Sequence, residues 1–240
     1  WYDPYQQDGK GVIDLEQIPN KFLTSSDCII VAGPICVCDS LVLIKIILAT
    51  LIPSPTIFGD EYLYAKAARS LYTDGALTVH NIPLSSYPPL YSLLLAPTYM
   101  FKDMAVIYLL MKIINSLLSS LIIIPSYLLW REFFDAKKAV LGAFLVGIMP
   151  LSIGIAPYIM AENLFYTLFL FAIYFLLKSI TTEKNYKHSV MAGIFLALAC
   201  LTKFTGLIAA GFIGLVMMWF ALKKQFDQVK KAAVTLGVAL

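Results

Sequence analysis

Charged residues are scarce in this sequence: they make up 14% of its 240 residues, against about 25% in soluble domains. Apolar residues make up 60%, above the roughly 45–50% found in soluble domains. The net charge is only +3, and the basic residues stand in short clusters between apolar runs, without one extended basic patch. This composition argues against a soluble globular domain and against nucleic-acid binding, and it predicts an integral membrane protein surrounded by the lipid bilayer.

Candidate metal ligands are also few. The four cysteines lie in apolar stretches without a CxxC pair or histidines at zinc spacing, so we interpret them as buried apolar residues. Of the two histidines, His188 falls in a predicted cytoplasmic loop and His80 in a predicted outer loop. His80 is a weak candidate metal ligand, since a single solvated histidine is the more common case.

The chain shows no signal peptide at its start. It opens with the polar WYDPYQQDGKGVIDLEQ, has no initiating Met, and stops inside the apolar AAVTLGVAL. We therefore expect an excerpt of a longer protein, with a polar cytoplasmic segment at 1–28 and a partial transmembrane domain over 29–240.

Long apolar runs dominate the rest of the sequence. A helix needs about 20 mostly apolar residues to cross the roughly 30 Å hydrocarbon core of a bilayer. Six runs meet or nearly meet this length, and a seventh begins near Ala232. The predicted spans are 29–52, 105–130, 139–156, 160–178, 189–203 and 205–222.

The basic residues predict how these spans are oriented. The loops 131–138, 178–188 and 223–231 are rich in Lys and Arg, and they share one side if each intervening pair of spans is a hairpin. Cytoplasmic loops retain positive charge, so this side is the cytoplasm. The segment 53–103 is then the one long outer connection. The sequence thus predicts an all-α, multi-pass plasma-membrane protein whose chemistry lies on the outer face.

The outer connection begins with a predicted helix from Asp60 to Thr73, which Gly75 ends. Its apolar face makes it an amphipathic helix of the kind that lies along a membrane surface. Asp60 and Glu61 stand at its start, at the mouth of the bundle. Asp60 has two compatible interpretations of equal weight: an N-cap that binds free backbone N–H groups, or a catalytic carboxylate.

A second short helix is predicted within residues 85–101, where Pro88 and Pro89 precede an apolar stretch. It is too short to span a bilayer, and counting it as a span would place the later basic loops outside. We therefore predict a re-entrant or interfacial helix. Tyr87 and Tyr91 are either interfacial aromatics or the lining of a sugar pocket.

Four ionisable residues stand within or beside predicted spans. Glu162 is at the outer end of one span, where it is either functional or simply interfacial. Lys203 lies in a tight outer turn, where it either binds a lipid phosphate or extends to the headgroups. Lys45 and Lys112 fall inside spans and need water, a partner or a position facing the bundle.

The order of several motifs carries a resemblance to a known family. A first span precedes GDEYLYAKAARSLYTDG, then YPPLYSLLLAP, then a span that ends in the basic WREFFDAKK. Two later segments also match the family's pattern, MAENLFYTLFLFAIYFLLKS and GIFLALACLTKFTGL, so the likeness covers roughly residues 30–222. This order resembles the N-terminal part of GT-C fold glycosyltransferases, most closely the branch with protein O-mannosyltransferases and the aminoarabinose transferase of lipid A.

The resemblance implies a GT-C-like helix bundle that moves a sugar from a polyprenyl-phosphate donor to a lipid, glycan or protein acceptor by inverting displacement. Asp60, with Glu61 adjoining, would be the essential acidic residue, taking the proton of the acceptor hydroxyl or orienting the acceptor. Lys203 or Arg69 would stabilise the leaving phosphate. The other predicted substrate-binding residues are Tyr64, Tyr87 and Glu162.

The sequence departs from the aminoarabinose transferase branch at one point. That branch has an acidic and a basic residue just before its proline pair, whereas Ser85, Ser86 and Tyr87 stand here. The substrate and the metal site of that branch are therefore not carried over. A divalent metal ion stays a candidate cofactor with unassigned ligands.

Two other functions fit a polytopic helical protein. A secondary transporter should show internal repeats and interrupted helices with polar groups at the midplane, and no repeat is visible. A non-catalytic scaffold subunit explains the helices but leaves the 53–103 loop unexplained. Substitution of Asp60 separates these alternatives from the transferase.

Overall fold

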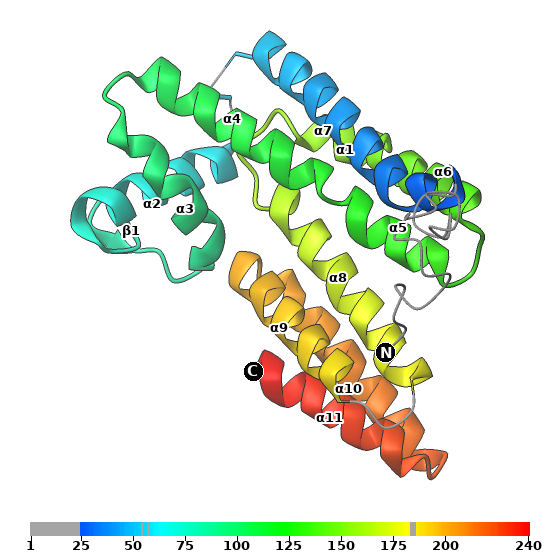
Figure 1. Cartoon of the computed structure of the whole chain (residues 1–240). Coiled ribbons are helices and arrows are strands. Elements are labelled where there is room, and N and C mark those ends of the chain that lie inside the picture. Colours follow the sequence, from blue (N-terminus) through cyan, green and yellow to red (C-terminus); the bar gives the residue numbers. More distant parts are fainter. Residues whose placement is uncertain (1–24, 54, 57, 183–185) are drawn as a thin grey trace, which may run out of the picture.

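The computed structural model describes residues 25–53, 55–56, 58–182 and 186–240, and this part of the chain folds almost entirely into helices (Figure 1). Most of the predicted cytoplasmic segment 1–28 lies outside the described residues. The elements in chain order are α1 Ser25–Leu51, α2 Gly59–Asp74, β1 Thr78–Val79, β2 Ile82–Pro83, α3 Pro89–Leu95, the 3₁₀ helix η3 Ala96–Met100, α4 Met104–Ser120, α5 Ile123–Arg131, α6 Ala136–Gly147, α7 Pro150–Ile155, α8 Glu162–Thr181, α9 Lys187–Thr202, α10 Thr205–Leu222 and α11 Phe226–Ala239.

The helices form two groups that meet at α8 (Figure 1). In the first group, α1 packs on α4 and α6, and α5 packs on α6. In the second group, α9 packs on α8, α10 and α11. α4 and α5 contact α8 and so join the two groups. The elements α2, β1, β2 and α3 cover one end of this arrangement, which we call the loop end.

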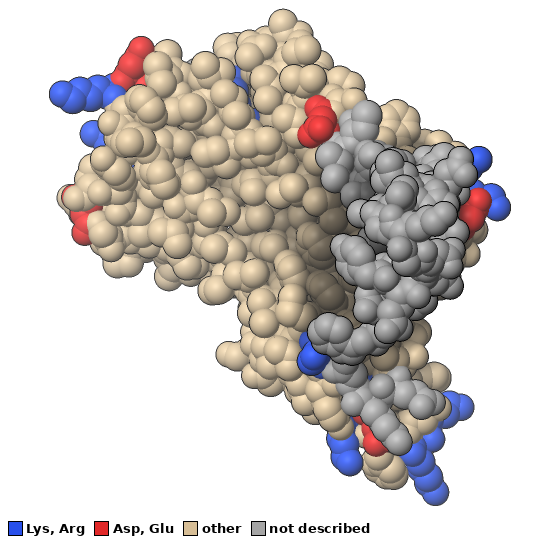
Figure 2. All heavy atoms as spheres, viewed as in Figure 1, with Lys and Arg blue, Asp and Glu red and all other residues tan. Residues whose placement is uncertain are grey.

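Three helices within the described residues are long and apolar enough to cross a membrane: Met104–Arg131, which contains α4 and α5, Glu162–Thr181 and Thr205–Leu222. They correspond to the predicted spans 105–130, 160–178 and 205–222. Uncharged side chains dominate the face seen in Figure 2, and charged ones stand mainly near its edges. The chain is an integral membrane protein, as its composition predicts.

Two predicted spans differ from the helices in the structure. The prediction of one span over 139–156 is wrong: α6 ends at Gly147 and α7 starts at Pro150, because extended backbone at Met149 and the ring of Pro150 interrupt the helix. The predicted span 189–203 corresponds to α9, which at 16 residues is a shorter apolar helix. The bundle therefore combines full-length and shorter helices.

The loop end has the predicted order of two short helices. α2 ends at Asp74 and is capped by Gly75, whose φ of 66° is a left-handed conformation that glycine adopts without strain. A hairpin follows in which Val79 pairs with Ile82, and His80 and Asn81 form the two-residue turn with positive φ. α3 then begins at Pro89 and is too short to span a bilayer, so the predicted short helix is present and its re-entrant or interfacial placement stays a prediction.

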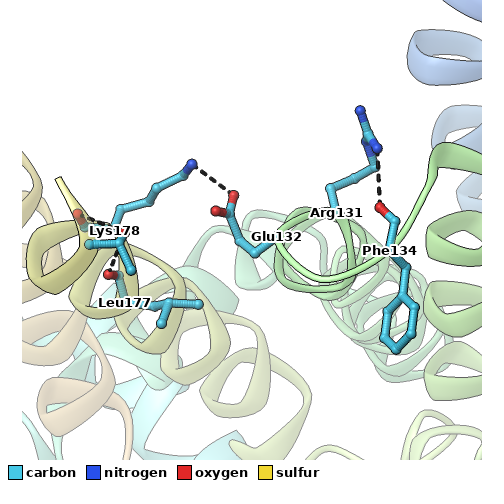
Figure 3. Close-up of polar contacts among 6 residues, drawn as sticks. Arg131, Glu132, Phe134, Leu177 and Lys178 are labelled. Carbon is cyan, nitrogen blue, oxygen red and sulfur yellow. Dashed lines mark hydrogen bonds and ion pairs between the residues drawn. The ribbon is translucent and has the colours of Figure 1, made fainter.

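The opposite end of the bundle is tied together by polar contacts (Figure 3). Lys178, in the last turn of α8, pairs with Glu132 just after α5, with 2.8 Å between Nζ and Oε1. Arg131 donates to the backbone oxygen of Phe134 at 3.2 Å. Lys231 of α11 donates to the backbone oxygen of Thr182 at 2.6 Å, where α8 ends. α8 is thus held at its far end, and its first residue, Glu162, lies at the loop end.

Candidate functional site

An apolar core fixes the loop end to the bundle. Tyr64 of α2 and Tyr91 of α3 are fully buried, and their rings meet edge to face with centroids 4.9 Å apart. Around them pack side chains from α4, α8 and α9. The buried members of this core include Leu95, Ile107, Met111, Ile159, Leu164, Phe165 and Ala199. The loop end is therefore a rigid cover on the bundle that can hold polar side chains in defined places.

Asp60 lies beside Tyr87 at the start of α2. Tyr87 donates its hydroxyl to Asp60 Oδ1 at 2.6 Å, across 27 residues of sequence. This hydrogen bond, with desolvation, raises the pKa of Tyr87 to about 12, so the phenol keeps its proton. Asp60 Oδ2 accepts no hydrogen bond from the described residues. One carboxylate oxygen is thus held, and the other can act as a base.

The structure corrects one of the two interpretations of Asp60. The N-cap position is occupied by Phe58, and no side chain caps the helix there. Asp60 is the second residue of α2, so the interpretation as an N-cap is wrong. It still stands in the first turn, where the helix dipole favours a negative charge.

Tyr64 and Glu162 belong to the same cluster. The ring of Tyr64 meets that of Tyr87 edge to face at 5.2 Å. The pKa of Tyr64 is raised by burial, and then by the charges of Glu162 and Asp60. Two carboxylates from elements far apart in sequence therefore act on one phenol. Tyr87 contacts both Asp60 and Tyr64, and Glu162 lies near enough for its charge to act on Tyr64. That these residues bind substrate stays a prediction.

Lys203 completes this cluster by pairing with Glu162. Its Nζ donates to Glu162 Oε1, and both side chains are partly buried. Glu162 Oε2 is buried without a hydrogen-bond partner among the described residues. Lys203 lies in the short turn between α9 and α10. Gly206 permits this tight turn because it lies against the backbone of Cys200: a Cβ at position 206 would be 2.8 Å from the backbone nitrogen of Cys200.

Glu61 has a different position from its neighbour. It is fully buried, and its Oε2 accepts hydrogen bonds from the backbone nitrogen of Thr56, at 3.0 Å, and from the Thr56 hydroxyl. Consecutive helical residues point about 100° apart, so Asp60 faces the cluster and Glu61 faces the interior. Glu61 therefore lies beside the predicted site, where it fastens the chain that leads into α2.

Arg69 and His80 do not join the cluster. Arg69 is exposed on α2, and no side-chain contact within the described residues joins it to the cluster. His80 Nε2 makes a 2.8 Å hydrogen bond with the hydroxyl of Tyr62 at the hairpin turn. No three His, Cys, Asp or Glu side chains gather to hold a metal ion anywhere in the described residues. These residues thus do not by themselves build a divalent-metal site, and metal dependence stays a prediction.

A groove of about 380 Å³ opens beside the cluster. Its lining is mostly apolar, and Tyr87 belongs to it, so the groove reaches the partner of Asp60. Lys203 lies between two of the lining residues in sequence. The groove residues are Leu77, Leu84, Ser85, Tyr87, Pro88 and Pro89 from the loop end, and Cys200, Leu201, Phe204 and Leu207 from α9, α10 and the turn between them.

Apart from Tyr87, sequence reasoning did not identify the groove residues. Leucine, proline and phenylalanine carry no chemical signature, and two segments more than 100 residues apart form the groove. The only available signal was the proline pair at 88–89, which marks the start of α3. Together the groove and the cluster can hold a molecule with a long apolar part next to a carboxylate and an ammonium group.

Comparisons with known proteins agree with this arrangement. The family model described as dolichyl-phosphate-mannose-protein mannosyltransferase matches residues 75–238, more than half of the chain. The match includes Tyr87, Glu162 and Lys203, and it begins after Asp60. No curated protein sequence matches the chain.

A solved structure shares the fold. The archaeal oligosaccharyltransferase AglB from Archaeoglobus fulgidus, in complex with an inhibitory peptide and a dolichol-phosphate, is similar with a TM-score of 0.63 at 20% sequence identity. The similarity covers 84% of this chain and 28% of AglB, so the chain spans little more than a quarter of that protein. The helical bundle has the GT-C fold, as predicted.

Proposed function

Because the chain belongs to the dolichyl-phosphate-mannose-protein mannosyltransferase family, we propose that it transfers a sugar from a polyprenyl-phosphate donor to an acceptor hydroxyl on the outer face of the plasma membrane. The observation that carries this proposal is the position of Asp60: its carboxylate is held by Tyr87, and Tyr87 lines the apolar groove.

The groove is the proposed site for the donor lipid. Side chains of α9 and α10, both apolar helices, form one wall, so a polyprenyl chain in the bilayer would enter along it without crossing water. The volume of about 380 Å³ lies within the range of small-molecule sites, enough for the first isoprenoid units and the phosphate. AglB was solved with a dolichol-phosphate, which supports a lipid phosphate on this fold.

The proposed reaction is a single displacement at the anomeric carbon. The acceptor oxygen forms a bond to that carbon as the bond to the phosphate oxygen breaks, and the configuration inverts. The electron pair of the broken bond leaves with the polyprenyl phosphate, and the hydroxyl proton passes to Asp60 Oδ2. Tyr87 orients the carboxylate by holding Oδ1. Phosphate is a good leaving group, so no protonating acid is required.

Lys203 is the proposed cation for the leaving phosphate. Developing negative charge is best stabilised by a cation that is already in place, and Lys203 stands between groove residues Leu201 and Phe204. Its pairing with Glu162 keeps it at the loop end before the donor arrives. Arg69 stays the second candidate, because it is exposed on α2 and has no side-chain contact with the cluster in the described residues.

A protein is the acceptor we favour among lipid, glycan and protein. The family is described by transfer of mannose from dolichyl phosphate to protein, and AglB was solved with a peptide. Mannose is accordingly the first sugar to test. A divalent metal ion at the phosphate stays a prediction, and loss of transfer on chelation, restored by added metal, is its test.

The deciding experiment measures transfer of labelled sugar from a panel of polyprenyl-phosphate donors by the full-length protein in membranes. Asp60→Asn is expected to abolish transfer at equal abundance. Asp74→Asn, at the exposed end of the same helix, is the matched control and should retain it. Equal transfer by wild type and Asp60→Asn would remove Asp60 from the mechanism.

The same experiment addresses the two other functions. If the wild type consumes no donor, the transferase proposal fails, and a secondary transporter or a scaffold subunit takes its place. The family match and the shared GT-C fold favour the transferase over both.

A further inference from the structure

Lys112 and Asn115 are two of the buried polar side chains of α4, and they lie one turn apart with 5% and 0% exposed. Residues three apart lie on the same face of a helix. Polar side chains inside a membrane protein are costly unless they are paired, so their partners indicate what they are for. Neither residue belongs to the cluster of Asp60, Tyr87, Glu162 and Lys203.

Lys112 holds the end of α1. Its Nζ donates to the backbone oxygen of Ala49 at 2.9 Å and to that of Ile52. Carbonyls in the last turn of a helix have no partner within the helix and stand at the negative end of its dipole, so an ammonium group is a suitable cap. From Ile52 the chain runs only a few residues before it reaches Asp60. Lys112 thus fixes the first end of the connection between α1 and α2, which leads to Asp60.

Glu61 fixes the other end of the same connection. Its buried carboxylate holds Thr56 through the backbone nitrogen and the hydroxyl. The connection from α1 to α2 is therefore anchored at Ile52 and at Thr56, which lies four residues before Asp60.

Asn115 holds two further segments. Its Oδ1 accepts the hydroxyl of Tyr91 at 2.7 Å, and its Nδ2 donates to the backbone oxygen of Tyr158 at 3.1 Å. Tyr91 lies four residues after Tyr87, and Tyr158 lies four residues before Glu162. One amide therefore links α4 to the segment that carries the partner of Asp60 and to the segment that carries the partner of Lys203.

We infer that Lys112 and Asn115 are positioning residues of the candidate site, which together hold the three separate segments bearing Asp60, Tyr87 and Glu162 at fixed places on α4. This inference rests on the proposed function for its kinetic test, but the anchoring itself has a readout independent of transfer. A displacement of about 1 Å at a reacting group can lower a rate about 100-fold.

The test compares Lys112→Met and Asn115→Leu with the matched control Lys45→Met in the full-length protein. Lys45 is also a fully buried lysine of the bundle, but it donates to the hydroxyls of Ser119 and Ser152 and holds none of the three segments. We expect kcat to fall about 100-fold in Lys112→Met and Asn115→Leu with the donor KM unchanged. Lys45→Met should lower thermal stability and leave kcat per folded protein unchanged.

Tyr91→Phe is a milder variant in case the others fail to accumulate. It removes only the hydroxyl that Asn115 accepts and keeps the ring packed against Tyr64. A lower kcat with an unchanged donor KM supports the inference. An unchanged kcat in Tyr91→Phe and in Asn115→Leu overturns it for Asn115, and an unchanged kcat in Lys112→Met overturns it for Lys112. An equal fall of kcat in Lys45→Met overturns it for both, because general destabilisation then explains the loss.

Hydrogen–deuterium exchange separates a failed inference from a failed function. Lys112→Met should raise exchange in residues 53–61, Asn115→Leu should raise it in 84–92, and Lys45→Met should raise neither. If the wild type transfers no sugar but these increases are seen, the proposed function fails and the anchoring stands. If exchange in both segments is unchanged, the anchoring is overturned whatever the activity.

Discussion

Replacement of Lys203 by methionine tests whether this lysine serves the donor phosphate or only its neighbour Glu162. In the wild-type background the two effects are mixed, because the substitution also leaves the Glu162 carboxylate unpaired, and that carboxylate already has one buried oxygen without a partner. In a Glu162→Gln background the repelling carboxylate is gone. Any remaining effect of Lys203→Met on donor binding then comes from the lysine and the phosphate alone.

The expected magnitude follows from the exposure of Lys203. A hydrogen bond to a charged group contributes about 1.5–3 kcal/mol. Since 1.4 kcal/mol changes Kd tenfold, this range corresponds to roughly 10- to 150-fold weaker binding. The side chain of Lys203 is 29% exposed, so solvent screening places the loss near the lower end, at about tenfold. Glu162→Gln alone should bind the donor at least as tightly as wild type, because it no longer competes for the ammonium group.

The assay is competition of polyprenyl phosphate with labelled donor on the full-length protein in nanodiscs. Wild type, the two single variants and the double variant form a double-mutant cycle. Lys102→Met is the control for loss of one exposed positive charge at the loop end, and its affinity should stay unchanged. If the double variant binds as tightly as Glu162→Gln, the lysine does not contact the phosphate, and the proposed role of Lys203 is refuted.

Three further predictions concern stability. Gly206→Ala should lower the free energy of unfolding by about 1–3 kcal/mol, because its methyl group would press against the backbone of Cys200. Gly211→Ala has open space and should be neutral or stabilising, so equal shifts of the two variants in thermal melts would contradict this. The pKa of Tyr87 is raised to about 12, so the neutral phenol should stabilise the folded state fully below pH 10.0, and this contribution should be lost as the pH rises toward 12. The loss of stability between pH 10 and 12 should therefore be smaller in Tyr87→Phe than in wild type. The partly exposed pair of Lys178 and Glu132 should couple by less than about 1 kcal/mol in a denaturation double-mutant cycle, and a larger coupling would contradict this.

The sequence was most informative where the membrane dictates a simple rule. A bilayer of fixed thickness requires a run of about 20 apolar residues, and no tertiary contact is needed to recognise it. The spans predicted at 160–178 and 205–222 therefore correspond closely to α8 and α10. The short helix near residue 89 was recognised by the same rule, because its apolar run was too short.

Helix breaks were harder to predict, although one carried a signal. Pro150 is a good first residue of a helix and a poor interior one, yet the predicted span ran through it because hydropathy alone does not record backbone geometry. The start of α2 was misplaced for a related reason. Asp60 is a strong capping residue by type, but the N-cap is Phe58, two residues earlier.

Pairs that are distant in sequence lay beyond pattern reasoning. Tyr87 reaches Asp60 across 27 residues and Lys203 reaches Glu162 across 41, and no periodicity relates either pair. Each of these residues was predicted separately as a site residue, and only the family resemblance placed them in one site. Arg69 was predicted for its charge, and its exposed position on α2 makes it the second candidate after Lys203.

Lys45 and Lys112 make the limit of sequence reasoning clear, because the two lysines look alike in the sequence. Each interrupts an apolar run, and the cost of a buried charge predicts only that each must face the bundle and find partners. Both do so, but Lys45 donates to hydroxyls of two helices, and Lys112 donates to the carbonyls that end α1. The difference decides which lysine can influence Asp60, and it arises from the place where α1 stops against α4. A charged side chain within a membrane-spanning helix therefore indicates that it binds another part of the bundle, and only its contacts identify which part.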